Sequence, residues 1–192
     1  MNKALLIVDL QNDFCSGGKL PVPEGDKVVD ILNRYIDIFK AKNLPIFASR
    51  DWHPEKTKHF KEFGGRWPKH CIQNTKGAEF HPELNLPESA VVLSAGIDPE
   101  SEGYSAFEGK NQKEEKFQDL LEKQNVEKLY IGGLATEFCV NHTVLEALKR
   151  GFKVQLLVDA IRGIDPEKSE QIKKEMFSRG AEKMTLDNLS GG

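Results

Sequence analysis

KALLIVDL, residues 3–10, is the stretch that decides the class of fold. Apolar residues fill it without a break from Ala4 to Val8, and the last two of them are β-branched. A run without hydrophobic alternation is typical of a strand that is buried on both faces. Such strands occur in parallel sheets that carry helices on both sides. The sequence therefore predicts an α/β protein built around this strand.

Strand-like and helix-like segments alternate along the rest of the chain. Further strands are predicted at LPIFASR (44–50), AVVLSA (90–95), EKLYIGGL (127–134), KVQLLVDA (153–160) and AEKMTL (181–186). Helices are predicted at 26–43, 114–125, 136–151 and 166–180, with Asp26 as an N-cap and Pro166 in a first turn. This order predicts a parallel, Rossmann-like, doubly wound sheet flanked by helices. Residues 1–192 show no repeat or linker and are predicted to form a single domain.

One segment interrupts the alternation. Residues 51–89 show little apolar periodicity and are rich in His, Trp, Pro and Gly. A long loop of this kind in a compact domain is usually functional. We therefore expect it to contribute to a binding site.

Charge and cysteine content narrow the classes of function. The net charge is −3, so no strong positive field recruits nucleic acid or an anionic membrane surface. No apolar run reaches the roughly 18 residues that span a bilayer. The cysteines Cys15, Cys71 and Cys139 form neither an even framework nor a CxxC pair, which favours a reducing cytoplasm. Cys15 and Cys71 are expected to be structural.

Polar residues follow three of the predicted strands, where ligands bind in open parallel sheets. Asp9 ends the first strand, Asp51 ends the second, and Cys139 lies in the first turn of a helix after GGLATEF (132–138). The helix dipole there favours a thiolate, which makes Cys139 a candidate nucleophile, although free cysteines more often only pack. Asp9 is a candidate general base or a structural aspartate.

The long loop carries a possible metal-binding set. Asp51 and His53 are two residues apart in an extended segment, and His70 follows in WPKHC (67–71). A carboxylate and two imidazoles suit a divalent ion, with surface or capping roles as the alternative. His59 and His81 are further candidates, each more typical of a surface histidine. The loop aromatics Phe14, Trp67 and Tyr104 either pack under the loops or sandwich a flat ring.

The chain resembles the nicotinamidases, within the isochorismatase-like cysteine hydrolases. The resemblance covers nearly the whole chain and rests on ALLIVDLQNDFCSGGKLPVPEGD (4–26), SRDWHP (49–54), GGRWPKHCIQNTKGAEFHPEL (64–84), YSAF (104–107) and GLATEFCVNHTVLEALKRGF (133–152). The WPxHC segment points to nicotinamidases rather than to the wider superfamily.

The resemblance implies a reaction and a role for each site residue. Cys139 would attack the carboxamide of nicotinamide, Asp9 would accept its proton, and a thioester would be hydrolysed to nicotinate; pyrazinamide is a further possible substrate. The amides of Ala135 and Cys139 would form an oxyanion hole, beside a cis bond between Ala135 and Thr136. Asp51, His53 and His70 would hold a divalent ion, with zinc favoured and iron or manganese as alternatives. Phe14 and Trp67 would line the pocket for the ring of the substrate, and Tyr104 would bind nearby.

Two positions depart from the family pattern. The family has a catalytic lysine nine residues before the tyrosine of YSAF, and this chain has Ala95 there. Loss of one member of such a charged set commonly costs several powers of ten in rate, so the chain is expected to be impaired. After DWHP, Thr57 and His59 stand where the family has His and then Ser, which puts His59 near the metal segment and leaves the metal's identity open.

Alternative functions remain open. One is a related hydrolase of the superfamily: an isochorismatase type, which generally lacks the cysteine, or an N-carbamoyl amidase, against which the metal set argues. Another is a non-catalytic homologue that binds nicotinamide. The resemblance also implies a homo-oligomer and a role in NAD salvage.

Overall fold

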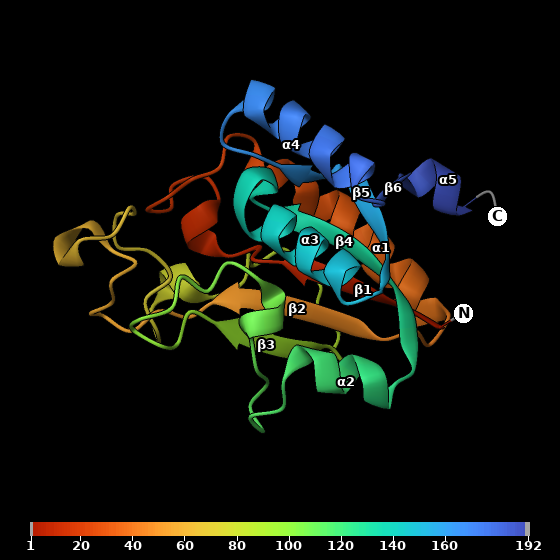
Figure 1. The fold of residues 1–192 in the computed structure, drawn as a ribbon, viewed down its shortest axis with the longest axis horizontal. Coiled ribbons are helices and arrows are strands. Elements are labelled where there is room, and N and C mark those ends of the chain that lie inside the picture. The colour runs from red at the N-terminus through yellow and green to blue at the C-terminus, as the bar shows by residue number, and fades with distance from the viewer. Residues whose placement is uncertain (1, 191–192) are drawn as a thin grey trace.

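The computed structural model describes residues 2–190 and contains one parallel sheet with the strand order β3-β2-β1-β4-β5-β6 (Figure 1). The strands are β1 (Asn2–Val8), β2 (Ile46–Asp51), β3 (Val91–Ala95), β4 (Val126–Leu134), β5 (Lys153–Arg162) and β6 (Glu182–Met184). Every neighbouring pair is parallel. The predicted fold class is therefore confirmed.

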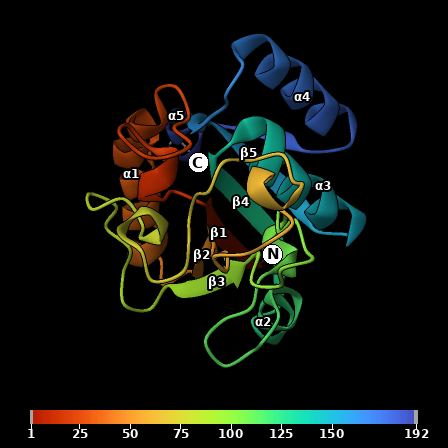
Figure 2. The same cartoon turned by 90° about the vertical axis from the view of Figure 1, so that its left-hand side faces the viewer.

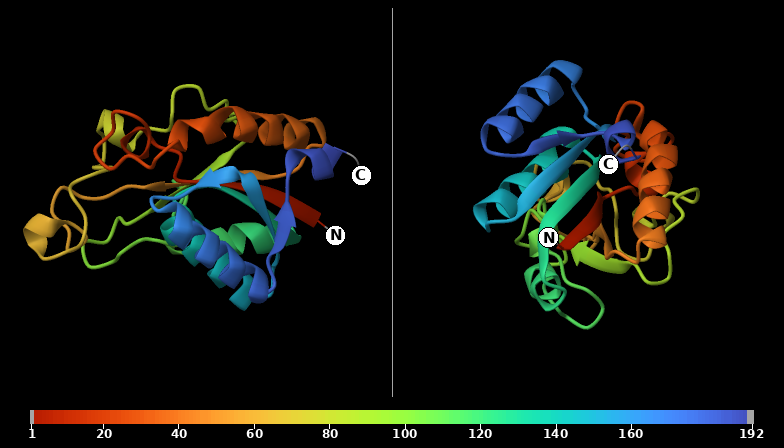
Figure 3. Two further views of the ribbon diagram at one scale, coloured as in Figure 1. Left: turned by 90° about the horizontal axis from the view of Figure 1, so that it is seen from above. Right: turned by 90° about the vertical axis from the view of Figure 1, so that its right-hand side faces the viewer.

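Helices cover both faces of the sheet (Figure 3). Helices α1 (Val28–Ala41) and α5 (Leu186–Ser190) lie on one face, and α2 (Phe117–Lys123), α3 (Asn141–Lys149) and α4 (Pro166–Ser178) lie on the other. The central strand β1 supplies side chains to the hydrophobic core on both faces of the sheet, because successive side chains of a strand point to opposite faces. Leu5 and Ile7 pack in the α1 layer, and Leu6 and Val8 pack in the α2–α3–α4 layer, all fully buried. This explains the unbroken apolar run.

The strand order reverses between β1 and β4. The chain leaves β1 toward β2 on one side, and β4 lies on the other side. The two strands approach so closely that a Cβ atom on Gly133, whose φ is +128°, would lie 2.0 Å from the carbonyl oxygen of Val8. Glycine is required here, and the carboxyl ends of β1 and β4 flank the crevice in which doubly wound sheets bind ligands.

The segment between β2 and β3 extends beyond the carboxyl edge of the sheet (Figure 1). Figure 2 shows the molecule from that edge, with this segment toward the viewer. Its regular structure is limited to short 3-10 turns at Lys61–Phe63 and Lys76–Ala78 and to isolated bridges. The prediction that residues 51–89 form a long loop with little regular secondary structure is thus confirmed. Its metal-binding role stays a prediction.

Several local predictions need correction. Asp26 is not the N-cap of α1: Lys27 holds that position, and the Asp26 carboxylate instead accepts the N–H of Ser16 at 3.0 Å. The predicted helix over 136–151 begins as a π-helical turn at Thr136–Val140, and α3 starts only at Asn141. The last strand is shorter than predicted and is followed by α5. The prediction for α4 is confirmed, with Pro166 in the first turn and Asp165 as the N-cap.

No helix within residues 2–190 has the length and apolarity needed to cross a membrane.

Candidate active site

A cavity opens at the carboxyl edge of the sheet. It encloses about 360 Å³, including its open mouth, and Cys139 lies in its lining together with Asp51, His59 and His70. Apolar residues form most of the remaining wall: Phe14, Leu20, Val22, Trp67, Tyr104, Ala135, Phe138 and Ile164. The predicted aromatics Phe14, Trp67 and Tyr104 therefore do meet at one cavity. Leu20, Val22, Phe138 and Ile164 were not predicted from the sequence to line this cavity.

The aromatic wall is held by specific contacts. The rings of Trp67 and Phe138 meet edge to face with centroids 4.8 Å apart. The indole Nε1–H of Trp67 donates to the Tyr104 hydroxyl at 2.7 Å. The guanidinium of Arg66 lies 4.9 Å from the Trp67 ring and 5.0 Å from the Phe138 ring. Such a wall suits a flat, aromatic ligand.

Cys139 lies in the turn that follows β4. The carbonyl of Ala135 starts this turn by accepting the N–H groups of Phe138 at 3.0 Å and Val140 at 3.2 Å. The cis peptide bond joins Leu134 to Ala135, not Ala135 to Thr136 as predicted. The cis bond therefore stands at the end of β4, one residue earlier than predicted, and the Ala135–Thr136 bond already belongs to the turn.

Asp9 lies beside Cys139 at the end of β1. A carboxylate oxygen of Asp9, the Cys139 sulfur and a carboxylate oxygen of Asp51 all lie within 4.8 Å of one another. Ser49 donates its hydroxyl to Asp9 at 2.6 Å. Burial, and then the charge of Asp51, raise the pKa of Asp9 to about 8, although hydrogen bonds with Cys139 and Ser49 lower it. Burial and the nearby carboxylate of Asp9 also raise the pKa of the Cys139 thiol.

Position 95 completes this part of the site. Ala95 is buried at the end of β3 and is paired in register with Asp51. It presents only a methyl group toward a region that holds two buried carboxylates, and it therefore offers them no compensating charge.

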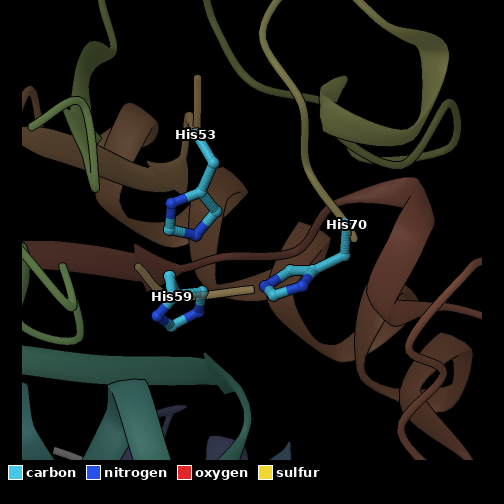
Figure 4. A group of neighbouring side chains, drawn as sticks. All are labelled: His53, His59 and His70. Atoms are coloured by element: carbon cyan, nitrogen blue, oxygen red, sulfur yellow. The ribbon is translucent and has the colours of Figure 1, made fainter. Parts of the chain in front are cut away.

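Three imidazoles converge beside Asp51, as Figure 4 shows for His53, His59 and His70. The Nδ1 atom of each has a partner: the Gly96 carbonyl for His53 at 3.2 Å, the Glu102 carboxylate for His59 at 2.9 Å and the Pro68 carbonyl for His70 at 2.8 Å. These partners are acceptors, so each Nδ1 carries the hydrogen. The Nε2 atoms are left to face a shared centre.

The carboxylate of Asp51 faces the same centre. Its Oδ2 atom lies 3.4 Å from Nε2 of His53 and 3.6 Å from Nε2 of His70. Burial alone would raise the pKa of Asp51, but its contacts with His53 and His70 and their charge lower it well below its usual range. The Nε2 atom of His53 is buried without a hydrogen-bond partner. An orphaned nitrogen among imidazoles and a carboxylate fits a divalent metal ion.

The structure thus brings together the predicted set Asp51, His53 and His70, and it adds His59. The expectation of a surface histidine is wrong for His59, whose side chain is 2% exposed. Burial, followed by the charge of His53, lowers the pKa of His59 to about 4, which keeps its imidazole neutral. The one feature of the sequence that pointed to a place for His59 in this cluster was its position shortly after DWHP (51–54).

His81 lies apart from this cluster. Its Nδ1 accepts the N–H of Glu83 at 3.2 Å, and its Nε2 faces Asp26 at 3.4 Å. The hydrogen is therefore on Nε2, which makes His81 a link between two loops rather than a partner of the other imidazoles.

Two polar side chains that sequence reasoning missed fix the loops around the site. The amide of Gln11 donates to the carbonyls of Asp51 and Ala78, and its oxygen accepts the Asp51 N–H, all at 2.8–2.9 Å. The carboxylate of Asp13 accepts the N–H of Cys71 at 2.7 Å. Both belong to LQNDF (10–14), where their closeness to the loop could not be read from spacing.

Glu137 fixes the opposite rim. Its carboxylate accepts the N–H groups of Ile164 at 3.1 Å and Asp165 at 2.8 Å, and the Ser169 hydroxyl at 2.9 Å. It thereby ties the turn that carries Cys139 to the loop between β5 and α4, which brings Ile164 to the cavity.

The remaining cysteines behave as expected for structural residues. Cys15 and Cys71 are buried, and all three cysteines are free. Burial is the largest cause that raises the pKa of each thiol, to about 12 for Cys15. A protonated, buried thiol is inert.

Comparison with known proteins places this site in a family. The isochorismatase domain matches residues 3–188. The nicotinamidase of Escherichia coli is 41% identical over 96% of this chain and 95% of its own length. The structure of a Pyrococcus horikoshii pyrazinamidase in complex with zinc is 49% identical, with a TM-score of 0.90 over 97% of this chain and all of that one. The structure of PnC1 from L. infantum in complex with nicotinate is 30% identical, with a TM-score of 0.87 over 97% of this chain and 94% of that one.

This chain belongs to the isochorismatase family. Its resemblance to the nicotinamidases within that family is confirmed by these relatives.

Proposed function

We propose that this chain is a cysteine amidohydrolase that converts nicotinamide and water to nicotinate and ammonia. The observation that carries the proposal is the pairing of Cys139 with Asp9 beside an aromatic cavity, at the strand-order reversal of the sheet. Relatives named nicotinamidase or crystallised with nicotinate support the substrate class. Pyrazinamide, also a flat aromatic carboxamide, is the proposed second substrate, in line with the Pyrococcus relative.

The proposed reaction uses Asp9 as a proton carrier. Asp9 accepts the thiol proton of Cys139, and the sulfur attacks the carboxamide carbon. Asp9 then returns the proton to the departing nitrogen, ammonia leaves, and a thioester remains. Water gives a proton to Asp9 and attacks the thioester carbon. The C–S bond then breaks, Asp9 passes its proton to the departing sulfur, and the acid product ionises to nicotinate. The N–H groups of Ala135 and Cys139 are the proposed donors to the oxyanion.

The aromatic wall has a positioning role in this proposal. Phe14, Trp67 and Tyr104 would hold the pyridine ring so that its carboxamide reaches Cys139. Ordering the ring in advance lowers the entropic cost of the attack.

A single divalent ion is the proposed cofactor, with zinc favoured and iron or manganese as alternatives. Asp51, His53 and His70 would hold it, together with His59. When bound, the ion supplies positive charge that orients and activates the pyridine ring. The convergent imidazoles support this assignment, as does the relative crystallised with zinc.

Ala95 is proposed to limit the rate. Where the family has a lysine, this chain has a methyl group beside two buried carboxylates. Without that cation, the thiolate of Cys139 is harder to form, because both Asp9 and Cys139 hold their protons more tightly. The same observation favours a second candidate function, a nicotinamide-binding protein with little turnover.

Ammonia release from nicotinamide tests these proposals, measured with and without a chelator, for the chain and for its Ala95→Lys variant. Slow release that rises in the variant supports an impaired amidohydrolase. Release from the variant alone supports the binding protein. No ammonia from either protein would overturn the nicotinamidase assignment.

Three finer aspects rest on the family resemblance alone. They are a role in NAD salvage, a cytoplasmic location and a homo-oligomeric state.

A further inference from the structure

A chain of hydrogen bonds and ring contacts joins the imidazole cluster to the aromatic wall of the cavity. His59 gives its Nδ1–H to Glu102 at 2.9 Å. The imidazole of His59 meets the ring of Tyr104 edge to face with centroids 5.6 Å apart, and the Tyr104 hydroxyl accepts the indole N–H of Trp67 at 2.7 Å. Glu102 therefore holds an imidazole that faces the proposed metal centre and that also packs against a side chain lining the ring pocket.

The acceptor of His59 differs from those of its neighbours. His53 and His70 donate to backbone carbonyls, whose positions the main chain fixes. His59 donates to a side-chain carboxylate, whose position the main chain does not fix. A carboxylate in this position fixes the tautomer of a ligating histidine, orients its ring and makes its free nitrogen more basic.

The Tyr104 side of His59 leads into the cavity. The ring of Tyr104 lies against the imidazole of His59, and its hydroxyl holds the indole of Trp67. Trp67 in turn meets Phe138 edge to face. The orientation of His59, which Glu102 holds, is therefore passed by direct contact to the residues of the cavity wall.

Glu102 itself is not held by packing. Its side chain is 58% exposed, whereas that of His59 is 2% exposed. A largely exposed carboxylate that meets a buried imidazole contributes through its hydrogen bond, and not by filling the core.

We propose that Glu102 is a positioning residue that fixes His59 for metal binding and, through the contact of His59 with Tyr104, couples the imidazole cluster to the ring pocket. The metal part of this inference rests on the proposed function. The hydrogen-bonding part does not, because it concerns the metal-free protein.

The first test reads the tautomer of His59 in the metal-free protein by ¹⁵N NMR of the imidazole nitrogens. We expect the Nδ1–H tautomer in the wild-type chain and in Glu102→Gln, whose amide oxygen still accepts. We expect its loss, or a mixture of tautomers, in Glu102→Ala. The matched control is Glu100→Gln on the same loop, because Glu100 pairs with Lys58 at the surface. An unchanged His59 tautomer in Glu102→Ala would overturn the proposal.

The second test measures zinc affinity by competition with a chelator. Loss of such a carboxylate typically weakens metal binding about 10- to 100-fold. We expect that loss in Glu102→Ala, a smaller loss in Glu102→Gln and none in Glu100→Gln. Equal affinities in all four proteins would contradict the proposal. A wild-type chain that binds no zinc would defeat the metal part of the proposed function, and the tautomer test would still decide the role of Glu102.

The third test separates the two ends of the chain of contacts. In zinc-loaded protein, Glu102→Ala should raise the KM for nicotinamide by loosening Tyr104 and Trp67. A purely structural role would lower the amount of folded protein and leave the KM unchanged. An unaltered KM would remove the link to the ring pocket from the proposal.

Discussion

The side chain at position 95 decides how the negative charge in the pocket is balanced. Asp9 and Asp51 are both buried there, and Ala95 is paired with Asp51 across the β2–β3 ladder. A cation at this position would lower the pKa of Asp9 and of the Cys139 thiol, because an opposite charge favours the ionised form of an acid. It would also stabilise the thiolate that attacks the amide.

We therefore expect Ala95→Lys to raise kcat for nicotinamide by about 100-fold or more, in keeping with the cost of removing a member of a charged catalytic set. The control is Ala95→Met, which has a similar length and no charge. Ammonia release under saturating substrate gives the comparison. Equal rates in the two variants would show that side-chain volume, and not charge, limits this site.

Asp9 should also leave a signature in the pH dependence of stability. Its pKa is 3.8 when unperturbed and about 8 in the metal-free fold, because of burial first and the charge of Asp51 second. A group with a raised pKa stabilises the fold fully below its unfolded value and loses that contribution as the pH rises through its folded value. The wild-type chain should therefore lose stability between these two values.

Asp9→Asn removes this loss. In metal-free protein, its free energy of unfolding should fall less steeply with pH than that of the wild-type chain, by at most about 1.4 kcal/mol per pH unit. Asp119→Asn, at an exposed position of α2, should follow the wild type. Urea titrations across this pH range measure the slopes, and parallel slopes for all three proteins would contradict a raised pKa for Asp9.

Among the elements, the π-helical turn at Thr136–Val140 depends on Glu137. One carboxylate holds two backbone N–H groups of the loop that leads into α4 and the hydroxyl of Ser169 in the first turn of α4. Groups left without their acceptor cost about 1–3 kcal/mol each when they are buried, and less where water reaches them. Glu137 therefore stabilises both the fold and the position of Ile164 at the cavity.

We expect Glu137→Ala to lower the free energy of unfolding by about 2–3 kcal/mol and to raise the KM for nicotinamide. Glu175→Ala is the matched control, because Glu175 forms only a surface pair with Arg179 on α4 and should cost less than about 1 kcal/mol. Urea unfolding and steady-state kinetics measure the two effects. A Glu137→Ala variant as stable as the control would mean that water replaces the lost acceptor.

How well the elements can be predicted depends on whether local sequence or distant contacts decide them. The strand at residues 3–10 and helix α4 have local signals, an apolar run and an N-terminal Asp-Pro pair, and both predictions are confirmed. Asp26 has the residue type of an N-cap, but a contact with Ser16 uses its carboxylate instead. The turn before α3 has the composition of a helix, and its π-helical geometry follows from the bonds to Ala135.

Prediction of the candidate site also depends on whether local sequence or distant contacts place each residue. Asp9, Asp51 and Cys139 could be placed together because parallel strands end at one edge of the sheet. His59 could not be distinguished from a surface histidine, because its burial depends on how the loop folds back over His53 and His70. Gln11 and Glu102 act on residues about 40 positions away, which no local pattern reveals.

For the whole molecule, the imidazole cluster is the point where the long loop meets the sheet. Asp51 is the last residue of β2, whereas His59 and His70 come from the loop that extends beyond the sheet edge. An ion held between them would tie the loop to the sheet, and that loop carries Trp67 of the cavity wall. Metal binding should therefore stabilise the folded chain as well as prepare the pocket.

We expect zinc to raise the melting temperature of the wild-type chain, because a ligand at about 100 times its Kd adds about 2.7 kcal/mol to the stability of the folded state. The rise should shrink as the pH falls, because protons compete with the ion for the imidazoles. Burial lowers the pKa of His53, but the contact with Asp51 and its charge raise it above its usual value in the metal-free fold.

His59→Ala removes one of the converging nitrogens and should reduce the zinc-induced rise in melting temperature. His81→Ala should keep that rise, because His81 faces Asp26. Thermal unfolding with chelator and with zinc gives the shift for each protein. Equal shifts in the wild type and His59→Ala, with a smaller one in His81→Ala, would place the ion at the loop contact of His81 and away from the cavity.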